Sequence, residues 1–462
     1  MKAIQQAHAI VIGGSMAGLL TARVLSDHFA EVTVVERDPV HDEPESRKGQ
    51  PQTRHLHALL AAGYEIIRAL FPGIEEELVA GGAMVDNPGT ERLFQFGGWK
   101  KQFDSDMRGC LSSRPYLEWQ IRRRLLALPN VRLLAACEVK KLLTNEDDSR
   151  VVGAEIVYRT DGREPETLAA DLVVDCAGRG SATPKWLDEW GYGRAPESRV
   201  KVNFAYSTRI YRRQPTDLPD ATTIMIAPTP PAKSGTFLFP IEGDRWIVTS
   251  GGMHGVEPPT DEAGFVEYIR NLPVPDIYNI ISRAEPLSDV VPHKFPFSLR
   301  RHYEKMKRFP AGLLVLGDAV ASFNPIYGQG MSSAAMQVAA LQKLLQKKGN
   351  APTLWRTYFK QAAKIVDMPW QIAVGEDFRW AETEGPKPPG TDLINRYTAY
   401  LHPVMEDDTV VYEQFMRVVH LLAAPTSLMH PRMLWRAWRW KGKKREDTAV
   451  TSPSAPKPIR QN

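Results

Sequence analysis

The chain contains only three cysteines, Cys110, Cys137 and Cys176, among 462 residues. They lie far apart, and none sits in a C-x-x-C or other metal-ligand spacing, so the sequence predicts neither a disulfide scaffold nor a metal site. The formal net charge is only +4, which gives no reason to expect nucleic acid as a partner. These shortages favour a protein of the reducing cytoplasm.

The sequence also lacks an uninterrupted apolar run of about twenty residues, and we therefore expect no membrane span. Its beginning has the early lysine and the apolar middle of a signal peptide. Glycines interrupt that run, however, and the strand-like stretch EVTVVERD follows at once, so we expect a folded domain here instead. The length, with 43% apolar residues, is enough for two or three packed domains.

A glycine-rich turn separates two apolar stretches near the N-terminus. Residues 8–12, HAIVI, predict a buried strand, residues 16–25 a helix, and residues 32–35 a second strand that ends at Glu36. In such a unit the bare amides of the helix bind a pyrophosphate, and the acid accepts hydrogen bonds from a ribose. The turn departs from G-x-G-x-x-G at Ser15. The alternative is a turn that closes a parallel sheet without a ligand. No second fingerprint is present, so we expect no separate NAD(P) domain.

A second glycine-rich stretch, GDAVASFNPIYGQGM, occupies residues 317–331. Residues 313–316 predict a strand that ends at Gly317 and Asp318, and open α/β sheets place ligand-facing groups at that edge. A helix predicted from Gly330 points its N-terminus at the same crevice, where its dipole favours negative charge. We expect a ligand to lie so close to this turn that side chains are mostly excluded.

Together these motifs resemble the single-component, FAD-dependent monooxygenases of the aromatic-hydroxylase (group A) type. The segments RKGQPQTRHLHALLAAGYEIIRALFPG, SSRPYLEWQIRRRL, DLVVDCAGRGS and FPIEGDRWIVTSGG are similar to the bacterial branch that epoxidises polyenes in polyether biosynthesis. The resemblance implies an α/β fold, with a Rossmann-like FAD-binding domain of the glutathione-reductase type, an interleaved β-sheet substrate domain and C-terminal helices. It also implies an enzyme of secondary metabolism.

The resemblance assigns cofactor contacts residue by residue. Asp318 would bind the ribitol chain, and the turn from Pro325 to Gly330 would lie against the isoalloxazine ring. Arg114 would touch the phosphates or ribose, and the backbone of Val139 would meet adenine. The expected FAD-binding residues are Gly13, Ser15, Met16, Ala17, Gly18, Glu36, Arg37, Arg47, Arg54, Arg114, Val139, Asp318, Pro325, Gly328, Gln329, Gly330 and Met331.

Two departures from the family's pattern concern the reduction of the flavin. The acid-glycine pair that is tied to FAD and NADPH contacts in the family is Ala177-Gly178 here, with an acid only at Asp175. The histidine common after the Gly-Asp pair is replaced by Ala321. The expected electron donor is NADPH or NADH, or a separate reductase protein.

Flavin monooxygenation needs few catalytic side chains, because a C4a-hydroperoxyflavin carries the reactive oxygen. We therefore predict no triad but an apolar pocket, in which O2 epoxidises or hydroxylates an apolar, unsaturated small molecule. The alternating stretches 202–211 and 235–254 supply candidate walls, although such stripes also form ordinary sheet cores. The candidates are Phe204, Tyr206, Phe237, Phe239, Trp246 and Met253.

Four other polar residues need an interpretation. His55 and His57 are two positions apart, and no nearby carboxylate or cysteine completes a metal site. Hydrogen bonds in a loop or at a helix start are therefore their favoured role. Glu376 and Asp377 are typical of the solvated edge of a helix.

The predicted FAD-binding domain is discontinuous. Its parts are residues 1–75, 105–190 and 285–370, and the substrate domain occupies 76–104 and 191–284. A C-terminal helical region is predicted over 371–445, in which apolar spacing resumes after a proline-rich break at 382–392. A disordered tail is predicted over 446–462.

Tryptophans alternate with Arg and Lys in residues 432–445. This pattern fits either a basic amphipathic segment on an anionic membrane or a C-terminal helix packed on the body. The packed helix is the favoured interpretation, because cations near a helix C-terminus are common.

Three further functions compete with a monooxygenase. A flavin reductase that saturates isoprenoid double bonds would share both glycine motifs. A flavin-binding protein without turnover, such as a membrane-associated scaffold, would share the cofactor residues. A flavin-dependent halogenase is disfavoured, because the W-x-W-x-I-P signature is absent.

Overall fold

The computed structural model describes residues 7–160 and 162–441. The first unit folds as predicted, into β1 (His8–Ile12), α1 (Met16–Ser26) and β2 (Glu31–Val35). Gly13 has φ +99°, and a Cβ at this position would lie 2.8 Å from the carbonyl oxygen of Cys176. Only glycine fits here without strain, because the turn passes close to the backbone that follows a neighbouring strand.

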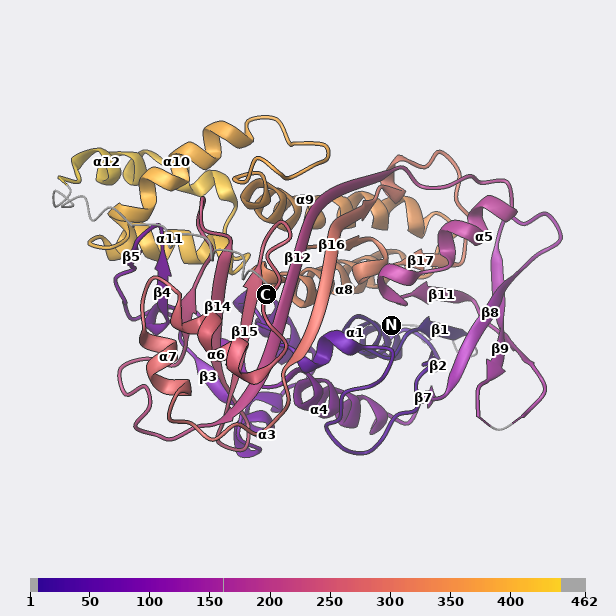
Figure 1. Ribbon diagram of the computed structural model, residues 1–462. Helices are drawn as coiled ribbons and strands as arrows, with labels where there is room; N and C mark the ends of the chain where they lie inside the picture. The colour runs from indigo at the N-terminus through magenta and orange to yellow at the C-terminus, as the bar shows by residue number, and fades with distance from the viewer. Residues whose placement is uncertain (1–6, 161, 442–462) are drawn as a thin grey trace, which may run out of the picture.

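β1 lies in the middle of a parallel sheet with the strand order β17-β11-β1-β2-β7. Its central strands are rich in Val, Ile and Leu and are buried, since both faces of the sheet are covered. Helices α1, α4 and α8 pack on one face, and the antiparallel strands β8, β9 and β10 lie on the other (Figure 1). The bounds are β7 (Val131–Leu134), β8 (Cys137–Thr144), β9 (Val151–Tyr158), β10 (Glu166–Ala169), β11 (Leu172–Asp175), β17 (Leu313–Val315), α4 (Arg114–Leu126) and α8 (Gly330–Lys348).

A second, largely antiparallel sheet has the order β18-β16-β12-β15-β14-β13-β4-β5. Its residues alternate between two faces, and one face packs against α6 and α7 around Phe265 and Ile277. The bounds are β4 (Arg92–Gln95), β5 (Gly98–Trp99), β12 (Glu197–Arg212), β13 (Ile224–Ile226), β14 (Ser234–Ile241), β15 (Arg245–Gly252), β16 (Val291–Arg301), β18 (Ala321–Ser322), α6 (Glu262–Arg270) and α7 (Asp276–Ile281).

The C-terminal helices form one end of the molecule, beside β4 and β5 (Figure 1). Leu401, Met405 and Tyr412 of this region share an apolar core with Leu93 of β4, so the predicted helical region is docked on the sheet. None of the described helices combines the length and apolarity needed to cross a membrane. The tail predicted over 446–462 lies outside the described residues. The bounds are α9 (Leu354–Asp377), α10 (Thr391–Val404), α11 (Thr409–Val419), the short 3-10 helix η7 (Pro425–Met429) and α12 (Pro431–Arg439).

Shorter elements join the two sheets. They are α2 (Ala61–Leu70), α3 (Ile74–Ala80), α5 (Thr183–Glu189) and the paired strands β3 (Met84–Asp86) and β6 (Gly109–Leu111). The division into domains stays a prediction, but one expected boundary cuts through the second sheet. β16 falls within the segment 285–370 assigned to the FAD-binding domain, yet it pairs with β12 along most of its length.

Candidate functional site

The two glycine-rich segments meet at the carboxyl edge of the parallel sheet. A Cβ added at Gly317 would lie 2.9 Å from the Cβ of Ala17, so the turn at Asp318 packs directly on the first turn of α1. A Cβ at Gly330 would lie 3.7 Å from Oδ1 of Asp318, which brings the N-terminus of α8 to the same place. We call this meeting point, formed by residues 13–18 with Asp318 and Gly330, the glycine junction.

Beside the junction, one buried arginine bridges two buried acids. Arg47 Nη1 lies 3.1 Å from Glu36 Oε2, and Nη2 hydrogen-bonds to Glu118 Oε1. Burial lowers the pKa of Arg47, but the carboxylates of Glu118 and Glu36 outweigh it and raise the pKa overall. Glu36 is held in turn by the backbone N–H groups of Gly14 (2.7 Å) and Asp38 (2.9 Å). The acid that follows the second strand is thereby fixed against the glycine turn.

The N-terminus of α1 lacks a capping side chain. Ser15 occupies the cap position, but its hydroxyl donates to Glu118 Oε2 (2.9 Å) and accepts from Arg114 Nη2 (2.9 Å) instead of bonding the helix. Amides at a helix start without a capping oxygen favour an anion. Arg114 adds a buried positive charge at this end of the helix, so the site suits a phosphate.

Asp318 is solvent-accessible and forms no hydrogen bond with a described residue. Desolvation by the surrounding protein atoms raises the pKa of the Asp318 carboxyl, whereas the positive charges of Arg114 and Arg179 lower it by a smaller amount. Gln329, in the adjoining turn, is buried, and its Oε1 has no hydrogen-bond partner among the described residues. Buried polar atoms without partners are rare. An acid free to accept hydroxyl groups, an uncapped helix and an unpartnered amide together fit a flavin dinucleotide.

The other predicted FAD contacts have varied settings. Arg37 is exposed and donates to the carbonyl oxygen of Gly49 (3.1 Å), and Arg54 is also exposed. Val139 lies at a bulge where β8 pairs with β9. The side chains of Met16 and Met331 are buried.

Asp175, the acid near the altered family motif, is occupied by its own loop. Its carboxylate accepts hydrogen bonds from Ala177 N (2.9 Å), Ser181 Oγ (2.5 Å) and Thr183 Oγ1 (2.5 Å). The residue is 1% exposed. Its role here is to hold the loop after β11.

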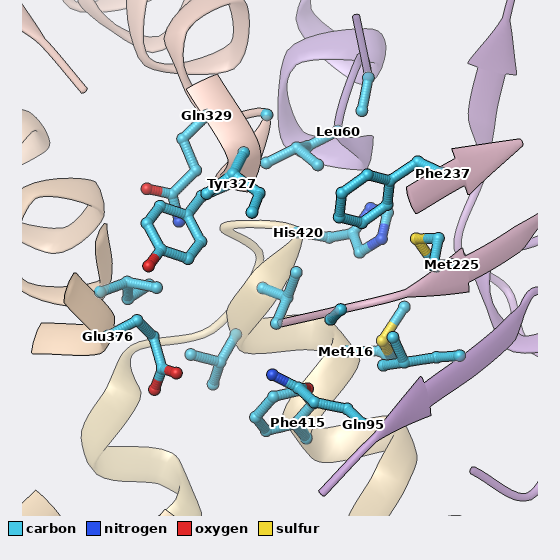
Figure 2. Close-up of a pocket in the computed structure, with 18 of the residues that line it drawn as sticks. Leu60, Gln95, Met225, Phe237, Tyr327, Gln329, Glu376, Phe415, Met416 and His420 are labelled. Carbon is cyan, nitrogen blue, oxygen red and sulfur yellow. The ribbon is translucent and has the colours of Figure 1, made fainter. Parts of the chain in front are cut away.

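A cavity of about 400 Å³ lies next to the turn at 325–329. One wall comes from the second sheet and another from α9, α10 and α11. In Figure 2, Phe237 and Met225 project from the sheet into the same space as Met416 and Phe415 from α11. The lining is predominantly apolar. Of the candidate pocket residues, Phe204, Tyr206, Phe237, Phe239 and Met253 line this cavity.

Trp246 does not line the cavity. Phe237 and Phe239 of β14 point to the cavity face, whereas Trp246 of the paired strand β15 points to the other face of the sheet, in the core with Phe265. Its indole Nε1 donates to Asp217 Oδ2 (2.9 Å). The alternation of side chains along a strand separates these aromatics, and the sequence did not show which face was which.

Asp377 corrects another expectation, because it is fully buried instead of lying on a solvated helix edge. Its Oδ1 accepts hydrogen bonds from Asn324 Nδ2 (2.8 Å) and Tyr327 OH (2.9 Å), both near the turn that borders the cavity. Oδ2 has no partner among the described residues. Burial raises the pKa of Asp377 to about 7, so the carboxyl is mostly neutral below that pH.

His55 and His57 make the loop hydrogen bonds that the sequence favoured. His55 Nδ1 lies 2.8 Å from Thr208 Oγ1, and His57 Nδ1 donates to the carbonyl oxygen of His55 (3.0 Å). Burial lowers the pKa of each to about 3, and both are neutral at physiological pH. His55 also stacks edge-on against Tyr206, which supports the cavity wall.

Sequence reasoning missed the contribution of the C-terminal helices and of two acids in the cavity wall. His420, at the end of α11, accepts the N–H of Ala61 through Nδ1 (3.2 Å) and lines the cavity. Asp86 and Glu91 also line it, and burial together with Asp86 raises the pKa of Glu91 well above its usual value. Only tertiary structure brings His420 to the same cavity as Asp86 and Glu91, since more than three hundred residues separate them in the sequence.

This fold and junction define a dinucleotide-binding flavoprotein. The chain belongs to the FAD-binding domain family, whose sequence profile matches residues 6–368. It is 35% identical over 438 residues to Protein Rv3254 of Mycobacterium tuberculosis (strain ATCC 25618 / H37Rv), with 90% of each chain covered.

Two solved structures share the fold at low sequence identity. The flavin-dependent brominase Bmp2 is 14% identical, with 93% of this chain and 99% of that chain covered and a TM-score of 0.65. A mutant of 2-methyl-3-hydroxypyridine-5-carboxylic acid oxygenase is 16% identical, with 88% and 97% covered and a TM-score of 0.60. These likenesses bear out the predicted fold class, an α/β FAD-binding fold with a second sheet.

Proposed function

We propose that the protein is an FAD-dependent monooxygenase that transfers one oxygen atom from O2 to a large apolar, unsaturated small molecule. The observation that carries this proposal is the apolar cavity, whose border includes the same turn, 325–329, that adjoins the glycine junction. A pocket enclosed by apolar side chains excludes water and selects an apolar substrate. The oxygenase and brominase that share the fold are consistent with oxygen-dependent flavin chemistry.

Each group at the junction has a proposed task in holding FAD. The first turn of α1 and Arg114 bind the pyrophosphate, Glu36 receives the ribose, and Asp318 accepts hydroxyl groups of the ribitol chain. Pro325 and Gly328 leave room for the flat ring, and a Cβ at Gly328 would already lie 3.0 Å from the Cβ of Ala58. When bound, the flavin supplies the redox chemistry that side chains lack.

The Asn324–Tyr327–Asp377 cluster positions the turn. Asp377 anchors Asn324 and Tyr327 through Oδ1, and below about pH 7 its carboxyl carries a proton. Among the polar groups that line the cavity, Asp86 and Glu91 are suited to bind a hydroxyl or amide group of an otherwise apolar substrate.

The resemblance of four sequence segments to bacterial polyene epoxidases is the reason to test epoxidation first, with hydroxylation as the alternative. One oxygen atom enters the substrate and the other leaves as water. The two electrons come from NADPH, NADH or a separate reductase. Because the loop of Asp175 is closed on itself, a nicotinamide needs a docking site other than that carboxylate.

The test is an isotope experiment with purified, FAD-loaded protein and a panel of apolar polyenes. Under 18O2 with an electron donor, we expect a product that is heavier by one labelled oxygen atom. Under strict anaerobiosis we expect no product. Conversion without oxygen would instead identify a reductase of double bonds, and a failure to reoxidise with any substrate would favour a flavin-binding protein without turnover.

A further inference from the structure

The exposed hydrophobic side chains of this protein are concentrated at its C-terminal end. Eight of the ten large hydrophobic residues that are exposed in the described chain lie between Leu393 and Trp438. We call these eight the C-terminal apolar surface. Trp438 is 79% exposed, Leu393 65% and Trp435 51%. Such concentration on one end of a molecule is unusual for a freely soluble surface.

The packing of α12 on the rest of the protein leaves these side chains uncovered. α12 is anchored through Met433 and Ala437, which are buried. Tyr400 of α10 donates its hydroxyl hydrogen to the carbonyl oxygen of Ala437 (2.8 Å), so α10 and α12 are held together. The favoured expectation of a packed helix is thus met on one face of α12, while Trp435 and Trp438 remain outside.

The charge on the α12 part of this surface has one sign. Residues 429–441 contain four cations and no acid. Arg436 is paired with Asp408 (2.7 Å), whereas Arg432, Arg439 and Lys441 are exposed. Arg439 lies over the ring of Trp435, with 4.6 Å from its Cζ to the ring centroid. Tryptophan and arginine together suit the headgroup region of an anionic bilayer.

The cavity reaches the same surface. Ile394 and Met429 both line the cavity and are exposed to solvent, at 45% and 42% respectively. Pro425 and Thr426 of η7 continue the lining. An apolar molecule that leaves a bilayer at this surface would therefore pass directly into the cavity without crossing water.

We propose that the C-terminal apolar surface docks the protein on an anionic membrane and that the cavity takes its apolar ligand from that membrane. The membrane docking is inferred from the C-terminal apolar surface alone, whereas the inference that the ligand is the substrate rests on the proposed function. A second copy is a poorer occupant, because two such surfaces would place exposed cations of the same sign against each other.

The experiment is co-sedimentation of the full-length, FAD-loaded protein with phosphatidylcholine vesicles that contain or lack phosphatidylglycerol. We expect binding to the anionic vesicles that weakens with added salt, and little binding to the neutral ones. The double variant Trp435→Ser/Trp438→Ser should bind about tenfold more weakly or worse, because the apolar contact is lost. Arg432→Gln/Arg439→Gln should reduce the preference for anionic vesicles.

The matched controls are Val79→Ser and Leu126→Ser, the two large exposed hydrophobic residues that lie outside this surface within residues 7–160 and 162–441. They should bind vesicles as the unmodified protein does. Equal binding by the tryptophan variant and the controls would overturn the proposal. The proposal would also be overturned if the unmodified protein bound no vesicles but formed dimers in sedimentation velocity, and if the tryptophan substitutions converted these dimers to monomers. Oxygen transfer is measured separately on detergent-dispersed polyenes, so a failed oxygenase assay leaves the docking result intact.

Discussion

The glycine junction and the cavity share one turn, yet they are built by different means. The junction consists of glycines and uncapped amides, and the charged Glu36–Arg47–Glu118 cluster lies beside it. The cavity consists of apolar side chains supplied by a sheet and by helices more than a hundred residues further along the chain. The first holds a ligand of fixed chemistry and so has a local signature. The cavity is formed by side chains from distant parts of the chain, so substitutions in its wall can adapt it to different substrates.

The largest effect is expected from Arg47→Met, which removes the cation from between two buried acids. Glu36 and Glu118 would then lie buried close to each other without a counter-charge, and the free energy of unfolding should fall by about 3–5 kcal/mol. Arg37→Met is the matched control, because Arg37 is mostly exposed and its ion pair with Asp38 is long, at 3.9 Å; it should cost less than about 1 kcal/mol. Urea unfolding of both apoproteins measures the difference. Equal losses of unfolding free energy in the two variants would show that Arg47 does not stabilise a buried pair of carboxylates beside the junction.

A smaller effect, on the ligand and not the fold, is expected from Asp318→Ala. Loss of hydrogen bonds to a charged acceptor costs about 1.5–3 kcal/mol, so the Kd for FAD should rise by tenfold or more. Asp220→Ala removes an exposed aspartate elsewhere and should leave the Kd unchanged. Titration of the apoprotein with FAD, followed by flavin fluorescence, gives both values. An unaltered Kd for Asp318→Ala would contradict its assignment to the ribitol chain.

The sequence predicted the junction well because its determinants are local. A strand, a glycine turn and a helix fix one another within about thirty residues, and β1, α1 and β2 form within a residue or so of the predicted bounds. The start of α8 at Gly330 is likewise where the glycine pattern placed it. The contact of Gly317 with Ala17 was not predicted, but it agrees with the rule that parallel strands present their carboxyl ends at one edge of the sheet.

The cavity could be predicted only in part. Alternation identified aromatic residues on strands but not the face each would occupy, which is why Trp246 belongs to the opposite core. Asp377 looked like a surface acid because its neighbours along the helix are polar, and only the fold brings Asn324 and Tyr327 to its carboxyl group. The docking of α10 and α11 on β4 depends on contacts across about three hundred residues, for which the sequence has no periodic signal.

Asp377 offers a test of the turn that joins the two regions. Its pKa of about 7 lies above the ~3.9 of an unfolded aspartate, so the folded protein binds the extra proton between these values. Its contribution to stability is therefore present at low pH and is lost as the pH rises toward 7. Asp377→Asn, which is always neutral, should remove this loss, on the order of 1 kcal/mol per pH unit.

The measurement is urea unfolding of Asp377→Asn and the unmodified protein from about pH 5 to about pH 7.5. Glu376→Gln is the control, because Glu376 is its half-buried neighbour and pairs with Arg379 (2.7 Å). It should leave the pH dependence of the unmodified protein in place. Parallel pH profiles for Asp377→Asn and the unmodified protein would mean that Asp377 is charged in the fold.

The smallest effect on the fold, and the sharpest separation of the two regions, is expected from Val419→Trp. Val419 lines the cavity from the end of α11, so a larger side chain there fills space without touching the junction. FAD content and the free energy of unfolding should change little. An apolar fluorescent probe such as anilinonaphthalene sulfonate should bind severalfold more weakly, because the tryptophan covers apolar cavity surface that the probe would otherwise contact. Val79→Trp, on an exposed helix position, should leave probe binding unaltered. If Val419→Trp released FAD as well, the cavity and the junction would have to be treated as a single site.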